Sequence, residues 1–279
     1  MLNTPQVEQY ASDGYVFLDG YYAPDEIRLI RGALQPVVQH RGERTVLEAD
    51  SAIVRSVYGV HQSDDFLGRL ARHSSLAQLA QQLLGGRVYV YQSKLNIKAA
   101  FDGGVWDWHQ DFIYWRREDG VRSPAVLTIA VFVDDVTEFN GPLIIIPQSH
   151  RHGSLESSSF DGKPAGYENS PSWISNLTAK IKYPVDRTKV SELAQRHGMV
   201  APKGRAGSVL IFDGNIVHAS QPNISPDSRR LLLCTYNRAD NAPALEGLHR
   251  PDFLVSRDVQ PLTVIQGALG SLTSLSAAE

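Results

Sequence analysis

The chain has 279 residues and a formal net charge of −3, with 42% hydrophobic and 20% charged residues. This balance is that of an ordinary globular protein and offers no basic surface for a nucleic acid or a polyphosphate. The one cysteine, Cys234, excludes an intrachain disulfide, fits a reducing compartment and is expected to be buried. The N-terminus has no signal-peptide pattern, and no apolar run reaches the roughly 18 residues of a membrane span. We therefore expect a cytoplasmic protein that does not bind membranes.

The first part of the chain, residues 1–86, is predicted to be mainly helical. Thr4 followed by Pro5 is a favourable helix start. From Pro24, apolar residues at spacings of three and four predict an amphipathic helix. A further helix is predicted over residues 65–84, where a Gly-Gly pair ends it.

The pattern changes to β-branched and aromatic residues with a period of two in residues 87–150 and 200–240, which predicts strands. The expected strands lie in RVYVYQSKLNIK, AVLTIAVFVDD, GPLIIIP, GSVLIF and RRLLLCTYN. Between them, residues 151–199 form a polar insertion with one predicted helix, a length typical of a functional lid or a long loop. Helices beside antiparallel strands predict a single α+β domain around a jelly-roll or sandwich core.

Candidate metal ligands lie in the stretch WDWHQDFIYW, residues 106–115. On a strand, His109 and Asp111 point to one side and can offer a nitrogen and a carboxylate oxygen to one ion. The same alternation places Trp115 on the ligand side and Tyr114 on the opposite side. His218, which follows the predicted strand GSVLIF, is the candidate for a third ligand.

Two histidines and one carboxylate leave coordination positions open, as in non-haem Fe(II) oxygenases, whereas zinc favours more histidine or cysteine. A lone His-x-Asp pair is a weak signal, and a packed core histidine is the alternative. The surroundings favour a site, because polar residues alternate along YQSKLNIK at Gln92, Lys94, Asn96 and Lys98. A polar face of this kind indicates a binding cavity inside a barrel, or else the solvated face of an edge strand.

A fixed cation for an anionic cosubstrate is also available. Arg229 begins RRLLLCTYN eleven residues after His218, and a guanidinium has the fork geometry that binds a carboxylate. Ser220 can add a hydroxyl hydrogen bond. A surface ion pair is the alternative interpretation of Arg229.

Together these motifs resemble the phytanoyl-CoA dioxygenase superfamily of Fe(II)/2-oxoglutarate oxygenases. The resemblance rests on WDWHQDFIYWRREDG, on the NGP turn before an apolar strand that ends in PQSH, and on IVHASQPNISPDSRR. Within the superfamily, YQSKLNIKAAF, DVTEFNGP and TYNRADNAP are most similar to bacterial amino-acid hydroxylases that act on leucine for nonribosomal peptide pathways. Ectoine hydroxylases resemble the chain more distantly: they share Trp115 and the EDG motif, but have serine for Gln110 and arginine for Lys94.

The resemblance implies a double-stranded β-helix, which is a jelly-roll of the cupin type, with N-terminal helices at its flank and a lid over residues Ser154 to Asn176. It assigns the Fe(II) ligands to His109, Asp111 and His218. The residues implied for 2-oxoglutarate are Asn96, Thr128, Ser220 and Arg229, with Thr128 beside Arg229 at the distal carboxylate. The residues implied for the substrate are Gln92, Lys94 and Trp115.

The implied activity is hydroxylation of an unactivated C–H bond of a free aliphatic L-amino acid, with leucine at its δ carbon as the first candidate and Fe(II), 2-oxoglutarate and O₂ as the reagents. Asp111 favours hydroxylation over halogenation, because related halogenases have a small residue there. Alternatives are another amino acid or a zwitterion such as ectoine, a non-catalytic jelly-roll that binds a small acid, and a zinc hydrolase. The expected partner is a small-molecule substrate, and the chain is expected to be a monomer or a homodimer.

Overall fold

The computed structural model describes residues 1–155, 159, 162–178, 180–244 and 250–277. Its core is formed by two antiparallel sheets. The large sheet has the strand order β1-β8-β6-β10-β4-β3-β2, and the small sheet has the order β5-β9-β7. The strands are β1 Tyr15–Leu18, β2 Thr45–Leu47, β3 Val54–Tyr58, β4 Val88–Lys98, β5 Trp106–His109, β6 Val126–Phe132, β7 Leu143–Ile146, β8 Val209–Asp213, β9 Val217–Ser220 and β10 Arg229–Arg238.

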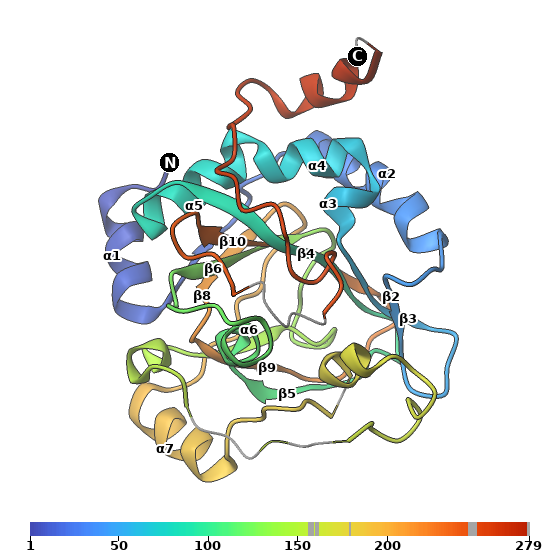
Figure 1. Cartoon of the computed structure of the whole chain (residues 1–279), viewed down its shortest axis with the longest axis vertical. Helices are drawn as coiled ribbons and strands as arrows, with labels where there is room; N and C mark the ends of the chain where they lie inside the picture. The colour runs from blue at the N-terminus through green and yellow to red at the C-terminus, as the bar shows by residue number, and fades with distance from the viewer. Residues whose placement is uncertain (156–158, 160–161, 179, 245–249, 278–279) are drawn as a thin grey trace.

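Helices cover one face of the large sheet. The α-helices are α1 Thr4–Asp13, α2 Pro24–Gln39, α3 Val60–Ser63, α4 Asp65–Arg72, α5 Ser74–Leu84, α6 Asp111–Asp119 and α7 Arg187–His197, and the 3-10 helices are η1 Ser149–His152, η2 Ser172–Leu177 and η3 Leu269–Ala277. Figure 1 shows α2, α4 and α5 on one side of the large sheet and the small sheet on the other. In the described part of the chain, no helix is long and apolar enough to cross a bilayer.

The predicted helices form with two corrections at their ends. Asn3, not Thr4, caps α1: its side chain accepts a hydrogen bond from the Gln6 amide, and the Gln6 side chain accepts one from the Asn3 amide. The helix predicted over residues 65–84 is two helices, because His73 adopts an extended backbone conformation between them.

Three strands that the sequence did not predict, β1, β2 and β3, lie within the first 86 residues. β1 pairs with β8, and β3 pairs with β4. Short strands of three to five residues depend on such distant partners for their stability, so their local pattern is a weak signal. The prediction of a mainly helical first part is therefore incomplete.

The two faces of β4, in the large sheet, differ in chemistry. Leu95 and Cys234 lie among the apolar residues packed under the helices, and Cys234 is buried as predicted. The alternate positions of β4, among them Lys94, Asn96 and Lys98, belong to the opposite face. Because β4 lies between β10 and β3 in the sheet, the edge-strand interpretation of this polar face is wrong. These residues face the interior of the barrel.

Candidate active site

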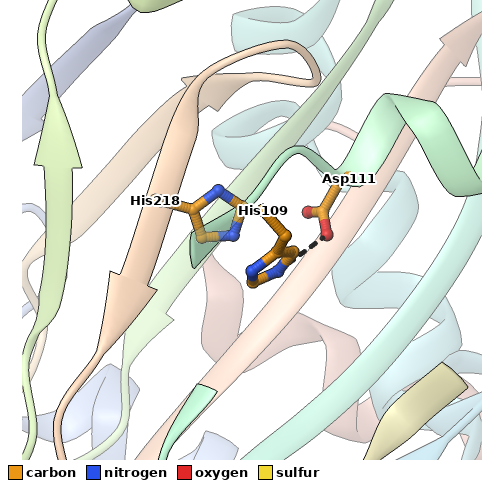
Figure 2. A group of neighbouring side chains, drawn as sticks. All are labelled: His109, Asp111 and His218. Atoms are coloured by element: carbon orange, nitrogen blue, oxygen red, sulfur yellow. Dashed lines mark ion pairs between the residues drawn. The ribbon is translucent and has the colours of Figure 1, made fainter. Parts of the chain in front are cut away.

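Three predicted ligands converge between the small sheet and α6. His109 on β5 lies directly opposite His218 on β9, and the centroids of their rings are 4.2 Å apart. Asp111 is the first residue of α6, and its Oδ1 lies 3.6 Å from Nε2 of His109. One ligand atom from each of the three residues lies within 4.8 Å of the others. Figure 2 shows the three side chains pointing toward one another. Within the described residues, no other group of three histidine, cysteine or acidic side chains meets this condition.

The route to this convergence differs from the predicted one. The strand ends at His109, and Asp111 belongs to a helix, so the assumption that residues 106–115 form one strand is wrong. Tyr114, predicted to point away, therefore lines the same cavity as Trp115. The change of element happens at Gln110, where the backbone leaves the small sheet.

Gln110 fixes this change of direction with a fully buried side chain. Its amide nitrogen donates to the carbonyls of Gly153, at 2.8 Å, and Asn215, at 2.5 Å. Its oxygen accepts from the Leu155 amide at 2.7 Å. The side chain thereby ties the turn before Asp111 to the loop that precedes β9 and to the start of the 151–199 insertion.

The two histidines present the same nitrogen to the centre of the site. Nδ1 of His109 lies 2.6 Å from the Asp107 carbonyl, and Nδ1 of His218 lies 3.1 Å from the Ile216 carbonyl. Since a carbonyl only accepts, each Nδ1 carries the proton and each Nε2 keeps a lone pair for a metal. Burial lowers the pKa of His109 to about 3 and also lowers that of His218, so both rings are neutral near pH 7.

The carboxylate of Asp111 is also held in its ligand form. Burial acts to raise its pKa, but Lys94 and the two imidazoles together outweigh this effect, and the pKa falls below its ordinary value. Two neutral imidazoles and one carboxylate, with no fourth ligand from the described residues, form the donor set that suits non-haem Fe(II).

A second group of buried polar residues comprises Arg229 on β10, Asn96 on β4 and Ser220 on β9. Arg229 is 0% exposed, and its Nε and Nη1 have no partner among the described residues, while Nη2 donates to the Gly141 carbonyl. The buried Ser220 Oγ and Asn96 Oδ1 also lack hydrogen-bond partners. Burial lowers the pKa of Arg229 to about 9. Because an unpaired buried guanidinium is costly, this arrangement fits an anionic ligand that supplies the missing acceptors.

Thr128 is not brought to this group. It pairs with Thr235 on β10, and their hydroxyl oxygens lie 3.0 Å apart. Thr235 is six residues from Arg229 on the same strand, roughly 20 Å at the usual rise per residue. One carboxylate cannot contact both side chains, so the expected sharing of the distal carboxylate by Thr128 and Arg229 is wrong.

A small cavity of about 30 Å³ opens beside the candidate ligands, and His109 and Asp111 are among the residues that line it. The three residues predicted for the substrate, Gln92, Lys94 and Trp115, all line it, as do Leu177 and Ile181 of the 151–199 insertion. The other lining residues are Tyr58, Trp106, His109, Asp111, Tyr114 and Arg250. Sequence reasoning missed Arg250, which stands in a segment without periodicity and 32 residues after the last ligand, His218.

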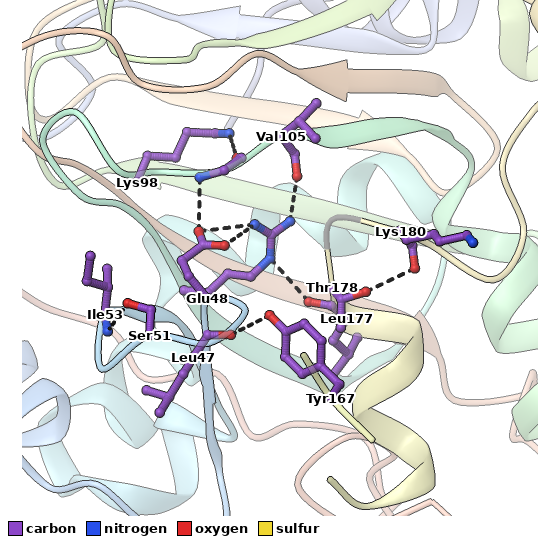
Figure 3. Close-up of polar contacts among 12 residues, drawn as sticks. Leu47, Glu48, Ser51, Ile53, Lys98, Val105, Tyr167, Leu177, Thr178 and Lys180 are labelled. Carbon is purple, nitrogen blue, oxygen red and sulfur yellow. Dashed lines mark hydrogen bonds and ion pairs between the residues drawn. The ribbon is translucent and has the colours of Figure 1, made fainter. Parts of the chain in front are cut away.

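A buried ion pair supports the strand that carries His109. Arg55 is fully buried and donates from Nη1 to both oxygens of Glu48, at 3.0 and 3.1 Å. It also donates to the carbonyls of Val105 and Leu177, and its guanidinium carbon lies 3.9 Å from the centre of the Trp106 ring. These contacts join β3 to the residue before β5 and to the 151–199 insertion. Figure 3 shows Glu48, Val105 and Leu177 around the guanidinium.

Comparison with known proteins assigns the chain to a family. The model of the family "Phytanoyl-CoA dioxygenase (PhyH)" matches residues 10–231. An L-proline trans-4-hydroxylase from Streptomyces griseoviridis is 40% identical over 257 residues, which cover 92% of this chain and 94% of the relative. An ectoine dioxygenase from Stutzerimonas stutzeri (strain A1501) is 34% identical over 272 residues, which cover 92% of this chain and 85% of the relative.

Solved structures agree with this assignment. The crystal structure of EctD from S. alaskensis with 2-oxoglutarate and 5-hydroxyectoine matches with a TM-score of 0.82 and 32% identity, over 96% of this chain and 89% of that one. The structure of EctD with bound Fe matches with a TM-score of 0.80 over the same shares of the two chains.

The chain therefore belongs to the phytanoyl-CoA dioxygenase family. It is an Fe(II)/2-oxoglutarate-dependent dioxygenase with a double-stranded β-helix core, as the sequence predicted. The alternatives of a zinc hydrolase and of a non-catalytic jelly-roll are thereby set aside.

Proposed function

We propose that this dioxygenase hydroxylates an unactivated C–H bond of a free aliphatic L-amino acid, with leucine at its δ carbon as the first candidate. The observation that carries the proposal is the meeting of two sites in one barrel. A group of two neutral histidines and one carboxylate lies next to a cavity with cationic side chains, and a buried arginine with unpartnered N–H groups lies on the large sheet.

In this proposal His109, Asp111 and His218 hold Fe(II) through the two Nε2 atoms and a carboxylate oxygen. When bound, the metal with 2-oxoglutarate supplies the oxidising chemistry that activates O₂. The protein fixes the ligand protonation through the two backbone carbonyls that accept from Nδ1. The aromatic lining, which includes Trp115 and Tyr114, excludes water from the reacting atoms.

Arg229 is proposed to bind the distal carboxylate of 2-oxoglutarate through its free Nε and Nη1 groups, with the Ser220 hydroxyl beside it. Asn96 is two strand positions from the Lys98–Arg229 pair in the sheet register, about 7 Å away. That spacing suits a side chain near the keto-acid end of a five-carbon diacid.

The cavity lining supports an amino-acid substrate. Lys94 and Arg250 supply positive charge for a carboxylate, and Gln92 supplies a polar group beside them. Trp115, Leu177 and Ile181 supply an apolar surface for an aliphatic side chain. Leucine is the first candidate because of the resemblance of YQSKLNIKAAF and TYNRADNAP to leucine hydroxylases.

Proline is the second candidate substrate, and a specific observation favours it. The relative from Streptomyces griseoviridis, which is 40% identical over 92% of this chain, is named for the trans-4-hydroxylation of L-proline. Proline and leucine are both small aliphatic amino acids with an unactivated C–H bond three or four bonds from the carboxylate.

The test is an assay of the purified protein with Fe(II), 2-oxoglutarate and O₂ against each standard amino acid and ectoine. Succinate formation and a product heavier by 16 mass units are followed together. We expect a +16 product with leucine or with proline and succinate in equal amount. Succinate without a hydroxylated amino acid would contradict the substrate class while leaving the dioxygenase in place.

A further inference from the structure

The EDG motif, Glu118 to Gly120, lies where α6 ends and has no part in the metal site. Asp119 is 1% exposed, and its two carboxylate oxygens accept from Nη1 of Arg250 at 3.0 and 2.8 Å. The hydroxyl of Tyr91 donates to the same carboxylate. Asp119 is thus a buried carboxylate that binds one arginine of the cavity and one tyrosine hydroxyl.

The arrangement leaves part of Arg250 available for a ligand. Its Nη1 is engaged by Asp119, while its buried Nε has no hydrogen-bond partner among the described residues. Arg250 lines the cavity beside Gln92 and Lys94. A guanidinium held on one side by a carboxylate can present its remaining N–H groups to a second carboxylate in a fixed direction.

The segment that follows Arg250 is hydrogen-bonded to β4, the strand that contains Tyr91. Nε2 of Gln92 donates to the Leu254 carbonyl at 2.7 Å, and the Ser256 amide donates to the Tyr91 carbonyl at 3.0 Å. Residues of β4 therefore hold both the carboxylate partner of Arg250, through Tyr91, and the backbone next to it. This leaves the guanidinium little freedom to move relative to the sheet.

α6 also connects this arginine to the metal site. The helix begins with Asp111 and ends with Asp119, eight residues later, which corresponds to about 12 Å along its axis. A helix of fixed rise is a rigid spacer between the metal ligand at its first position and the arginine partner at its last. Together with the contacts from β4, this helix sets the distance from the metal site to the end of the cavity where Arg250 lies.

We propose that Asp119 is a positioning residue, which holds Arg250 through a buried carboxylate so that the guanidinium receives the substrate carboxylate at a fixed distance from the metal. This inference rests on the proposed function, because it takes the substrate to be a free amino acid. It assigns to Asp119, within the EDG motif, a part in the choice of which carbon of the substrate is presented for hydroxylation.

The neighbouring carboxylate has different partners. Glu118 accepts from Lys182 Nζ at 2.8 Å and from the Tyr183 hydroxyl at 2.5 Å, both in the 151–199 insertion. It makes no hydrogen bond to Arg250 in the described structure. The two adjacent acids of the motif therefore make separate contacts, and Asp119 is the one that binds Arg250.

The experiment measures binding of leucine and of leucinamide, which lacks the carboxylate, to the anaerobic Fe(II)/2-oxoglutarate holoenzyme through tryptophan fluorescence. If proline is the substrate in the activity panel, proline and prolinamide replace them. We expect the wild-type protein to prefer the acid over the amide by about 30-fold or more, as expected for a charge-assisted contact of about 2 kcal/mol. Asp119→Asn should reduce this preference to about threefold and leave the Kd of 2-oxoglutarate within twofold.

The matched control is Asp240→Asn, the same substitution at the exposed ion pair with Arg238, which should keep the wild-type preference. If Asp119→Asn does not fold, Tyr91→Phe, which removes one hydrogen bond to the carboxylate, should lower the preference by about threefold to tenfold. Equal weakening of acid and amide would show a merely structural role and overturn the proposal, as would an unchanged preference. Failure of the wild-type protein to bind any amino acid overturns the proposed function as well, and is recognised before any variant is compared.

Discussion

His109 and His218 owe their ligand form to two backbone carbonyls. A His-x-Asp pair in a sequence does not reveal which imidazole nitrogen is free, whereas the Asp107 and Ile216 carbonyls determine it in the fold. The residue types of the metal group were predictable from the sequence, because the His-x-Asp pair and the later histidine occur together with the other family motifs. Their protonation was not, because it depends on burial and on partners that only the fold supplies.

Arg229 provides the first prediction at this scale. Arg229→Ala should raise the 2-oxoglutarate concentration needed for half-maximal succinate formation by roughly 100-fold or more, since loss of a buried charge contact costs about 3 kcal/mol. The kinetic titration of 2-oxoglutarate measures it. Arg238→Ala, at an exposed ion pair, is the control, and an unchanged requirement in Arg229→Ala would remove Arg229 from the cosubstrate site.

Lys98 provides a prediction on pH. It is 1% exposed, and burial, with the charges of Arg229 and Arg55 adding to it, lowers its pKa to about 6 from an ordinary value near 10.5. Between these two values the unfolded chain holds a proton that the folded chain has released. The free energy of unfolding of the ligand-free protein should therefore rise with pH from about 6 upwards, by at most about 1.4 kcal/mol per pH unit for this one group.

Lys98→Met should remove most of that slope between pH 6.5 and 8.5. Urea unfolding at several pH values measures it, and Lys203→Met, at a partly exposed lysine, should keep the wild-type slope. A Lys98→Met protein with the same slope as the wild type would show that Lys98 stays charged in the fold.

At the scale of elements, α6 shows why the sequence predicted a strand in the wrong place. Its residues DFIYWRRED include several aromatic and β-branched types and are buried on almost every side of the helix. Such a helix has no apolar stripe with a period of 3.6, so the local pattern favours a strand. At the end of β5, the Gln110 side chain and the Phe112 amide donate hydrogen bonds to carbonyls that are distant in the chain. These carbonyls belong to Gly153, Asn215 and Gly214.

The side chain of Gln110 should stabilise the junction of β5 and α6. Gln110→Ala removes three hydrogen bonds of a buried side chain at the junction of β5 and α6. It should lower the free energy of unfolding by about 2–4 kcal/mol. It should also weaken Fe(II) binding by about tenfold or more, because the position of Asp111 relative to His109 is then no longer fixed. Thermal unfolding and an anaerobic Fe(II) titration measure the two effects.

The control for this variant is Gln195→Ala on the exposed surface of α7, which should change neither quantity by much. If Gln110→Ala unfolds like the wild type and binds Fe(II) with the same affinity, the turn is held by its backbone alone and the role given to Gln110 is wrong.

Across the whole molecule, β4 of the large sheet carries an apolar face toward the helices and a polar face toward the barrel interior. The alternation along β4 predicted this division from the sequence, because a strand with two different faces shows a period of two. Such patterns could not predict that Arg250 lines the cavity, or that Thr128 lies far from Arg229. Both depend on which strands become neighbours, and pairing such as β10 between β4 and β6 cannot be read from local spacing.

In the proposed function, the metal group, the buried Arg229 and the amino-acid cavity act together inside one barrel in a single hydroxylation. The most direct measurement supplies ¹⁸O₂ to the Fe(II)-loaded protein with 2-oxoglutarate and the active amino acid. We expect one ¹⁸O atom in the hydroxylated amino acid and one in succinate, and neither product from Asp111→Ala. An amino-acid product without ¹⁸O, or full activity in Asp111→Ala, would contradict it.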